Sequence, residues 1–365
     1  MVTLAQPAAT GGSPSDELGV SAARTALLAT LEAVPIYDLT LDLETVQPIQ
    51  LSEHPGSALR GALVQALLDT HCTNKAARSC AECPLVRVCP VSALVAPLRD
   101  EAPRGRDVPR PFVITPPHPA PRTLEANSRW SFGLTVFGSA AALFPYIVLS
   151  RARLEANGLG LRSETGRRGR VAVRRISSLS GDGQNIVLYE PGTAGVVAPR
   201  PTPAAARIAA RAAAIDGDHL TLRFHSPMRL KAGGELMRRP QPTVLVHRIL
   251  ERWEGLRREY GPSGWSDPLA LLRGPLPEGA RGDPRALLAI ADTITIAHDD
   301  TAWLDLASYS SRQHCFTPIG GFVGDATLAG NVAALAEALA LGEVIRAGKD
   351  VVKGNGRYEM LPTSP

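Results

Sequence analysis

A basic, glycine-rich segment near the end of the sequence has the residue types needed to hold a phosphate. Gly348-Lys349 is followed closely by Lys353-Gly354-Asn355-Gly356-Arg357-Tyr358. Glycines permit positive φ and let backbone amides approach phosphate oxygens, the cationic side chains neutralise charge, and a tyrosine ring offers a face for stacking. A mononucleotide P-loop runs from a strand into a helix, whereas this segment is predicted to run from a helix into a strand, which argues against ATP. The alternative is a tight turn with incidental charge.

Four of the five cysteines lie close together, and their spacing is typical of a metal site. They are Cys72, Cys80, Cys83 and Cys89. Clustered thiolates with a central C-x2-C favour a structural metal over disulfides, and both zinc and a 4Fe–4S cluster suit this loop. Reduced core cysteines are the alternative, which the polar neighbours disfavour. The fifth, Cys315, is expected to be buried in a strand.

A second glycine- and arginine-rich stretch occupies the corresponding position of the first half, between a helix and a strand. Its candidate RNA-binding side chains are Arg162, Arg167, Arg168 and Arg170. Such a stretch is suited to contacts with a nucleic-acid backbone, although a solvated basic hairpin would have the same composition.

The composition is that of a globular protein long enough for two domains. The chain has 365 residues, 44% hydrophobic and 20% charged, and a net charge of +4. Only four of its 39 cationic residues are lysines, and the arginines cluster. We expect no membrane helix and no signal peptide, because no run of about 20 apolar residues and no basic start followed by an apolar core is present. With clustered reduced cysteines, this predicts a cytoplasmic protein.

Hydrophobic periodicity predicts an α+β protein with the same order of elements in both halves. Each half reads strand–helix–strand–strand–helix–strand, the βαββαβ pattern of a ferredoxin-like (RRM-like) domain. We therefore predict two tandem ferredoxin-like domains with a four-cysteine metal-binding insertion in the first. The expected divisions are a flexible extension (1–33), an N-terminal domain (34–180) with the insertion at 72–90, a linker (181–218) and a C-terminal RNA-binding domain (219–365).

These motifs together resemble a known family. Tyr309-Ser310-Ser311-Arg312-Gln313, Pro318-Ile319-Gly320-Gly321-Phe322-Val323-Gly324, a helix and then the basic glycine segment are similar to the C-terminal domain of the CRISPR-associated repeat endoribonucleases of the Cas-six family, within the RAMP superfamily. So is the opening of that domain, Leu220 to Lys231. In the first half, Leu59-Arg60-Gly61-Ala62-Leu63 and the cysteines resemble a subgroup of that family.

The resemblance implies an endoribonuclease that cleaves CRISPR precursor RNA within the repeat to give mature guide RNAs. The ribose 2′-hydroxyl attacks the adjacent phosphate without a metal, leaving 2′,3′-cyclic phosphate and 5′-hydroxyl ends, so no cofactor is required for cleavage. This reaction needs proton-transfer groups and cations. The family's histidine lies near the first helix, so His54 is preferred and His71 follows; Lys75, Tyr37 and Arg60 are possible helpers. His225 is a less favoured third histidine.

The implied RNA-binding residues outside the second basic stretch come from both halves. They are Arg60, Arg229, Lys231, Arg312, Gly348, Lys349, Lys353, Gly354, Gly356, Arg357 and Tyr358. The partner is CRISPR repeat RNA, with other CRISPR effector subunits as further partners and no membrane. Two alternatives remain: a non-catalytic repeat-binding RAMP subunit of an effector complex, and a metal-containing structural protein with an unrelated role.

Overall fold

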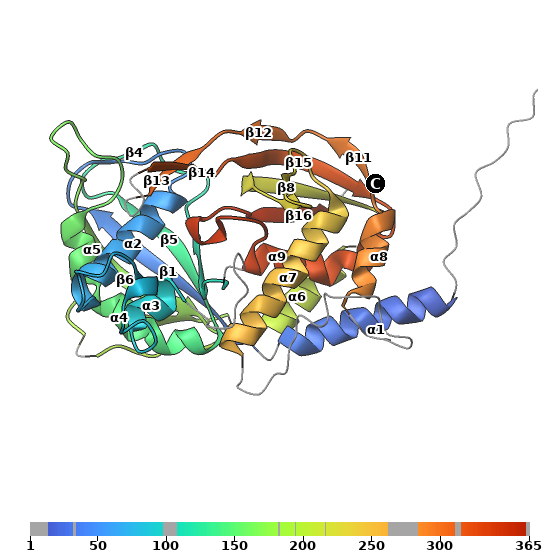
Figure 1. Cartoon of the computed structure of the whole chain (residues 1–365), viewed down its shortest axis with the longest axis horizontal. Helices are drawn as coiled ribbons and strands as arrows, with labels where there is room; N and C mark the ends of the chain where they lie inside the picture. Colours follow the sequence, from blue (N-terminus) through green and yellow to red (C-terminus); the bar gives the residue numbers. More distant parts are fainter. Residues whose placement is uncertain are drawn as a thin grey trace, which may run out of the picture.

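The structure, a computed structural model of the chain, describes residues 14–31, 34–97, 108–181, 183–193, 195–215, 217–261, 284–310 and 315–362. It forms two halves that lie side by side, each with an antiparallel sheet (Figure 1). None of the helices in these ranges has the length and apolar character needed to cross a membrane.

The first half is built on a five-stranded sheet. Its order is β3 (Phe112–Thr115), β5 (Arg129–Phe137), β1 (Ile36–Thr45), β6 (Val171–Leu179) and β7 (Asn185–Tyr189). The alternation of Leu39, Leu41 and Leu43 predicts one buried face for the central strand, and these side chains are 2%, 2% and 1% exposed. A small additional ladder pairs β2 (Ile49–Gln50) with β4 (Thr123–Leu124).

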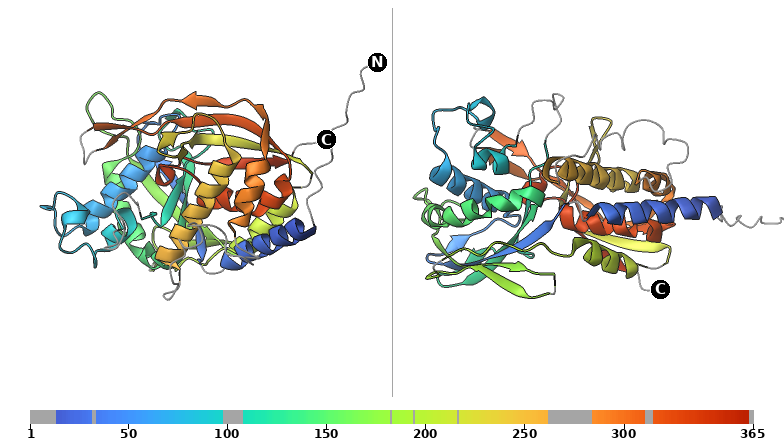
Figure 2. Two further views of the ribbon diagram at one scale, coloured as in Figure 1. Left: turned by 45° about the vertical axis from the view of Figure 1, so that its right-hand side comes forward. Right: turned by 90° about the horizontal axis from the view of Figure 1, so that it is seen from below.

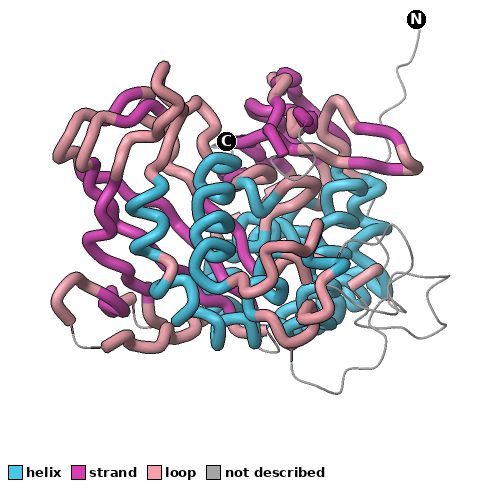
Figure 3. Tube along the Cα trace, turned by 60° about the vertical axis from the view of Figure 1, so that its left-hand side comes forward, coloured by secondary structure: helices cyan, strands magenta, loops and turns pink. Residues whose placement is uncertain are grey.

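The helical elements of this half pack around the long helix α2, which contacts α3, α4 and α5. They are α2 (Gly56–His71), η1 (Cys80–Glu82), α3 (Pro90–Val95), η2 (Gly138–Leu143), α4 (Phe144–Leu149) and α5 (Arg151–Asn157). Figure 3 distinguishes these helices from the strands by colour.

The second half has a sheet of the same design. Its order is β11 (Thr295–Asp299), β15 (Gly321–Ala329), β8 (His219–Met228) and β16 (Tyr358–Pro362), with β12 (Ala302–Leu304) also on β15. In both halves the order across the sheet is the fourth, first, third and second strand of a βαββαβ unit. The α+β class is confirmed, and the topology is consistent with ferredoxin-like domains.

The second half carries more helices and two hairpins. The helical elements are α6 (Ala204–Ala213), α7 (Pro242–Tyr260), α8 (Ala286–Thr293), η4 (Val332–Leu335), α9 (Ala336–Ile345) and η5 (Val351–Lys353). The hairpins are β9 (Lys231–Ala232) with β10 (Glu235–Leu236), and β13 (Ala307–Ser310) with β14 (Cys315–Pro318). The hydroxyls of Ser308 on β13 and Ser57 on α2 lie 2.5 Å apart, so the second hairpin reaches the other half.

Part of the segment expected to be a flexible extension forms a helix, and the linker contains the strand and the helix that its sequence allowed. Residues 14–31 of the predicted flexible extension form α1 (Pro14–Leu31), which packs against α6, α8 and α9 (Figure 2). Arg24 binds Glu337 at 2.6 Å, and Trp253 Nε1 donates to Thr30 Oγ1. The extended apolar face of this helix, with Leu27 and Leu31 1% and 2% exposed, explains the difference. The predicted linker contains β7 and α6, and α6 packs on α9.

Candidate active site

The segment that connects the two halves most closely is residues 348–357, which we call the glycine loop. A Cβ at Gly56, the first residue of α2, would lie 2.0 Å from the Lys353 carbonyl oxygen. A Cβ at Gly354, whose φ is +84°, would lie 2.8 Å from Pro116 Cδ beyond β3. Both positions therefore require glycine, because backbone and a proline ring occupy the space a side chain would need. The loop holds α2 and the chain after β3 against the second half.

His54 lies two residues before α2 and is half-buried. Partial burial is the main cause that lowers the pKa of His54, the positive charge of Arg122 lowers it further, and Glu53 opposes both. Arg122 itself binds Glu53 at 2.8 Å. A lowered pKa keeps this imidazole neutral near neutral pH, which is the form that can accept a proton.

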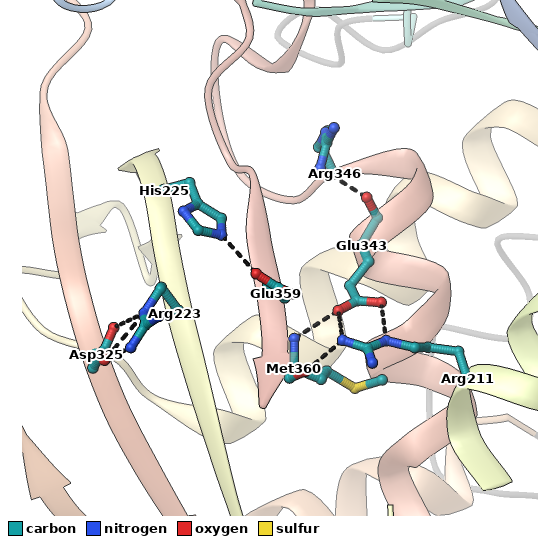
Figure 4. A network of polar contacts seen from close by, with 8 residues as sticks. All are labelled: Arg211, Arg223, His225, Asp325, Glu343, Arg346, Glu359 and Met360. Atoms are coloured by element: carbon teal, nitrogen blue, oxygen red, sulfur yellow. Dashed lines mark hydrogen bonds and ion pairs between the residues drawn. The ribbon is translucent and has the colours of Figure 1, made fainter. Parts of the chain in front are cut away.

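Two further histidines meet beside the glycine loop. His118, in the segment after β3, contacts His225 on β8 with ring centroids 4.7 Å apart. His225 Nε2 lies 3.1 Å from Glu359 Oε2 on β16, and Figure 4 shows this pair across the two neighbouring strands. Partial burial lowers the pKa of His118, and so do the positive charges of His225, Arg357 and His54. We call His54, His118 and His225 the histidine cluster.

Arg357, the last residue of the glycine loop, is fixed by its backbone beside this cluster. Its N–H donates to Ser226 Oγ at 2.9 Å, and its carbonyl accepts from His225 N–H at 3.0 Å. Burial lowers the pKa of Arg357, although the guanidinium remains charged at neutral pH. Three imidazoles and a guanidinium from both halves thus form a site that can transfer protons next to a bound phosphate.

Comparisons with known proteins identify the second half. Residues 222–358 match the family model of the CRISPR-associated endoribonuclease Cas6. Residues 222–358 are a Cas6 domain. Residues 34–202 match a family model described as an N-terminal domain. No curated protein sequence matches the chain significantly. The resemblance inferred from the sequence is therefore confirmed for this half, and its match to the Cas6 family model supports a general role in CRISPR RNA processing.

Solved structures similar to this chain are also Cas6 and RAMP proteins. A partial Cas6-RT-Cas1–Cas2 complex has a TM-score of 0.50 at 14% identity, over 90% of this chain and 46% of that one, which supports the shared fold. Cas6 from Thermus thermophilus has a TM-score of 0.47 at 16% identity, over 90% and 99%. A RAMP protein binding different RNA substrates has a TM-score of 0.36 at 11% identity, over 89% and 99%.

The structure separates the other predicted catalytic residues from this site. His71 ends α2, about 22 Å from its start at 1.5 Å per residue. Its Nε2 lies 3.1 Å from the Tyr146 carbonyl oxygen. Lys75 is exposed beyond the same end of the helix. Tyr37 is half-buried on β1, where it lies opposite Val136 of β5.

Predicted RNA-binding residues of the Cas6 domain fall into different environments. Lys349 and Lys231 are exposed, whereas Lys353 is half-buried and binds Asp350 at 2.9 Å. The backbone amide of Lys349 donates to the Arg229 carbonyl, and a Cβ at Gly348 would lie 2.7 Å from that oxygen. A Cβ at Gly356 would lie 2.0 Å from the Ala347 carbonyl oxygen. The loop glycines therefore serve close packing of the protein itself.

Tyr358 does not offer the stacking face expected of it. Its side chain is 2% exposed, its ring packs near Phe224, and its hydroxyl donates to the Leu339 carbonyl. The strand β16 turns this side chain into the core, which the residue type alone did not reveal. Arg312 lies outside the described residues. Exposed aromatic side chains occur instead on the β13–β14 hairpin, where the ring centroids of Tyr309 and Phe316 lie 5.3 Å apart.

The second basic stretch lies beside the segment that leads to His54. Leu161 N–H donates to the Gln50 carbonyl, and a Cβ at Gly160 would lie 2.4 Å from the same oxygen. Three of its four candidate arginines are exposed, whereas Arg168 is half-buried; they are Arg162, Arg167, Arg168 and Arg170. Arg60, on α2 near His54, is half-buried. This region can extend a cationic surface from the histidine cluster across the first half.

The structure does not support a metal centre at the four cysteines. Within the described ranges, no group of three or more His, Cys, Asp or Glu side chains could hold a metal ion. Cys72, Cys80, Cys83 and Cys89 are half-buried and form no disulfide. The segment contains the short helix η1 and several hydrogen-bonded turns, and Asn74 Nδ2 lies 3.6 Å from Cys83 Sγ. Cys315 is exposed on β14, so its predicted burial is wrong.

The sequence did not single out His118, and it placed His225 third among the candidate histidines. His118 belongs to a proline-rich segment with no motif, and it meets His225 through packing between residues 107 positions apart. The local signal for His225 was its place directly before Ser226-Pro227 on β8, where its backbone N–H donates to the Arg357 carbonyl of the glycine loop.

Proposed function

We propose that this protein is an endoribonuclease that cleaves CRISPR precursor RNA within the repeat and needs no metal for the reaction. The observation that carries the proposal is the histidine cluster, which gathers with Arg357 where the glycine loop joins the two halves. The matching Cas6 family model supplies the substrate class. Two ferredoxin-like domains, with the boundaries predicted from the sequence, would present this site to RNA.

In the proposed reaction His54 is the general base. It removes the proton from the ribose 2′-hydroxyl, whose oxygen attacks the adjacent phosphorus and displaces the 5′-oxygen. The products are a 2′,3′-cyclic phosphate and a 5′-hydroxyl. Arg357 stabilises the charge that builds up on the phosphorane. His54 also stands at the amino end of α2, where the helix dipole favours an anion.

Several cationic and aromatic groups around this site would hold the RNA. The exposed arginines of the second basic stretch, together with Lys349 and Lys231, would contact phosphates and make binding depend on salt. Tyr309 and Phe316 on the β13–β14 hairpin present exposed rings on which unpaired bases could stack.

Incubation of the protein with end-labelled repeat RNA separates this proposal from its alternative. The proposal requires cleavage at a fixed position in the repeat, with a scrambled RNA left intact. Tight, salt-dependent binding without any cleavage would identify a non-catalytic RAMP subunit of an effector complex. Failure to bind either RNA would reject both functions.

A structural zinc ion or 4Fe–4S cluster at the four cysteines rests on their spacing alone. Metal analysis of the purified protein tests it, and broad visible absorbance in anaerobically prepared protein would select the iron–sulfur cluster. Protein that contains neither zinc nor iron would contradict this proposal and leave the proposed RNA cleavage unaffected.

A further inference from the structure

The His118–His225 pair gives the proposed active site a second imidazole group that is independent of His54. The two rings meet edge to face, 4.7 Å between centroids and 61° between planes. His118 comes from the first half and is exposed, whereas His225 comes from the Cas6 domain and is half-buried. The His118 imidazole is therefore accessible at the surface, and the His225 ring packs against it.

Contacts on both sides fix this pair in place. On the side of His118, Gly354 packs against Pro116 two residues earlier. On the side of His225, its backbone N–H is bonded to Arg357, and its Nε2 lies 3.1 Å from Glu359 Oε2 (Figure 4). The Glu359 carboxylate thus holds the His225 ring, against which the His118 ring packs.

The charges that act on His118 make its position suitable for an anion. His225, Arg357 and His54 all face it with positive charge when protonated, and the carboxylate of Glu359 is directed at His225. A phosphate bound among these groups would offset their mutual repulsion and stabilise protonated His118. His118 would then be the cationic acid of the proposed reaction once RNA is bound.

We propose that His118 is a second catalytic residue, which protonates the leaving 5′-oxygen while His54 takes the proton of the attacking 2′-hydroxyl. This inference rests on the proposed function. The bond from the 2′-oxygen to phosphorus forms as the bond from phosphorus to the 5′-oxygen breaks. One proton passes from the 2′-hydroxyl to His54 and one from His118 to the 5′-oxygen, so no further reactant is needed. Exchange with water restores both histidines.

In this arrangement His225 and Glu359 are positioning residues that orient His118. They act through its ring and do not contact the reacting atoms. Loss of His225 should therefore affect the same chemical step as loss of His118, by a smaller factor.

A leaving group that needs no proton tests the role of His118 directly. Single-turnover cleavage is compared on ordinary repeat RNA and on the same RNA with a 5′-bridging phosphorothiolate at the cleaved bond, because a thiolate leaves without protonation. His118→Ala should slow cleavage of the ordinary RNA by about 100-fold or more and cleave the phosphorothiolate nearly as fast as wild type. His225→Ala should show the same pattern more weakly. His54→Ala should be slow on both substrates.

Matched controls keep the interpretation specific. His219→Ala removes a histidine from the opposite end of β8, where it binds Asp218, and should leave both rates unchanged. His118→Gln keeps a polar side chain without proton transfer and should behave like His118→Ala. The melting temperature of both His118 variants should match wild type, because His118 is exposed.

The outcomes distinguish this inference from the function on which it rests. If His118→Ala cleaves ordinary RNA at the wild-type rate, or is equally slow on both substrates, the acid role is wrong while the nuclease stands. If wild-type protein cleaves neither substrate, both the proposed function and this inference are rejected.

Discussion

His54 is the residue on which the proposed proton abstraction depends. His54→Ala should reduce single-turnover cleavage of repeat RNA by about 100-fold or more, because the neutral imidazole that accepts the 2′ proton is lost. RNA affinity, measured by filter binding, should change little. His71→Ala should leave the cleavage rate near the wild-type value, because His71 lies at the other end of α2. The reverse pattern would move the active site to the cysteine-containing end of the helix.

The pH dependence of cleavage should report the environment of His54. Its pKa is lowered from 6.5 by partial burial and by Arg122, so the neutral form persists to lower pH than in a free histidine. Activity should therefore fall as pH drops through a midpoint below 6.5 in a kcat/KM profile. Arg122→Gln removes a positive charge and frees Glu53, and both changes should move this midpoint to higher pH. A midpoint that shifts downward would contradict the assignment.

Residue type and local position were enough to select His54, because a histidine before a helix start is visible in the sequence. They were not enough for His118, whose partner lies across the junction of the two halves. They also failed for Tyr358, since the direction in which β16 turns a side chain depends on the register of the whole sheet. A side chain's role in RNA binding depends on such contacts as much as on its chemistry.

The start of α2 is the element that joins the proposed base to the glycine loop. Gly56→Ala should lower the free energy of unfolding by about 1–3 kcal/mol, because its Cβ would lie 2.0 Å from the Lys353 carbonyl oxygen. Gly61→Ala is the matched control on the same helix, with nothing within 4 Å of the new Cβ. It should raise stability by about 0.5–1 kcal/mol, since alanine favours helix over glycine. Urea denaturation measures both, and equal effects would show that the loop does not press on Gly56.

Helix α1 was not predicted from the sequence. Leu27→Ala should cost about 2–5 kcal/mol of unfolding free energy, because the side chain is 1% exposed. Thr25→Ala, at an exposed position of the same helix, should change it by less than about 0.5 kcal/mol. Thermal and urea unfolding of both variants provide the comparison. A Leu27 variant as stable as wild type would mean that α1 does not pack on the second half in solution.

Strands were easier to predict than helix boundaries. The alternating leucines of β1 predict a strand, whereas alanine- and leucine-rich stretches are compatible with more than one kind of secondary structure. The apolar spacing over 139–157 predicts a single helix, whereas the structure divides this segment into η2, α4 and α5, with Pro145 in the first turn of α4. The apolar spacing over 328–341 predicts a helix that begins at Leu328, but Leu328 lies on β15 opposite Leu220 and is 1% exposed. Its buried environment is created by a strand 108 residues earlier in the chain.

At the scale of the whole molecule, the proposed site exists only where the two halves meet. The Tyr260 hydroxyl donates to the Pro109 carbonyl, and Arg346 Nη2 donates to Thr115 Oγ1. Hydrogen bonds therefore cross the junction before β3 and at its last residue. Burial lowers the pKa of Arg346 to about 10, and its backbone has a φ of +66° next to the glycine loop. The sequence predicted two similar halves, but it could not predict which surfaces meet or which histidines they bring together.

The most direct test of the account is cleavage of labelled repeat RNA in the presence of EDTA, followed by identification of the new ends. Wild-type protein should cleave at an undiminished rate and leave a 2′,3′-cyclic phosphate on the upstream product and a 5′-hydroxyl on the downstream product. His54→Ala should lose nearly all cleavage. Cleavage that stops in EDTA, or products with a 3′-hydroxyl and a 5′-phosphate, would contradict the proposed mechanism.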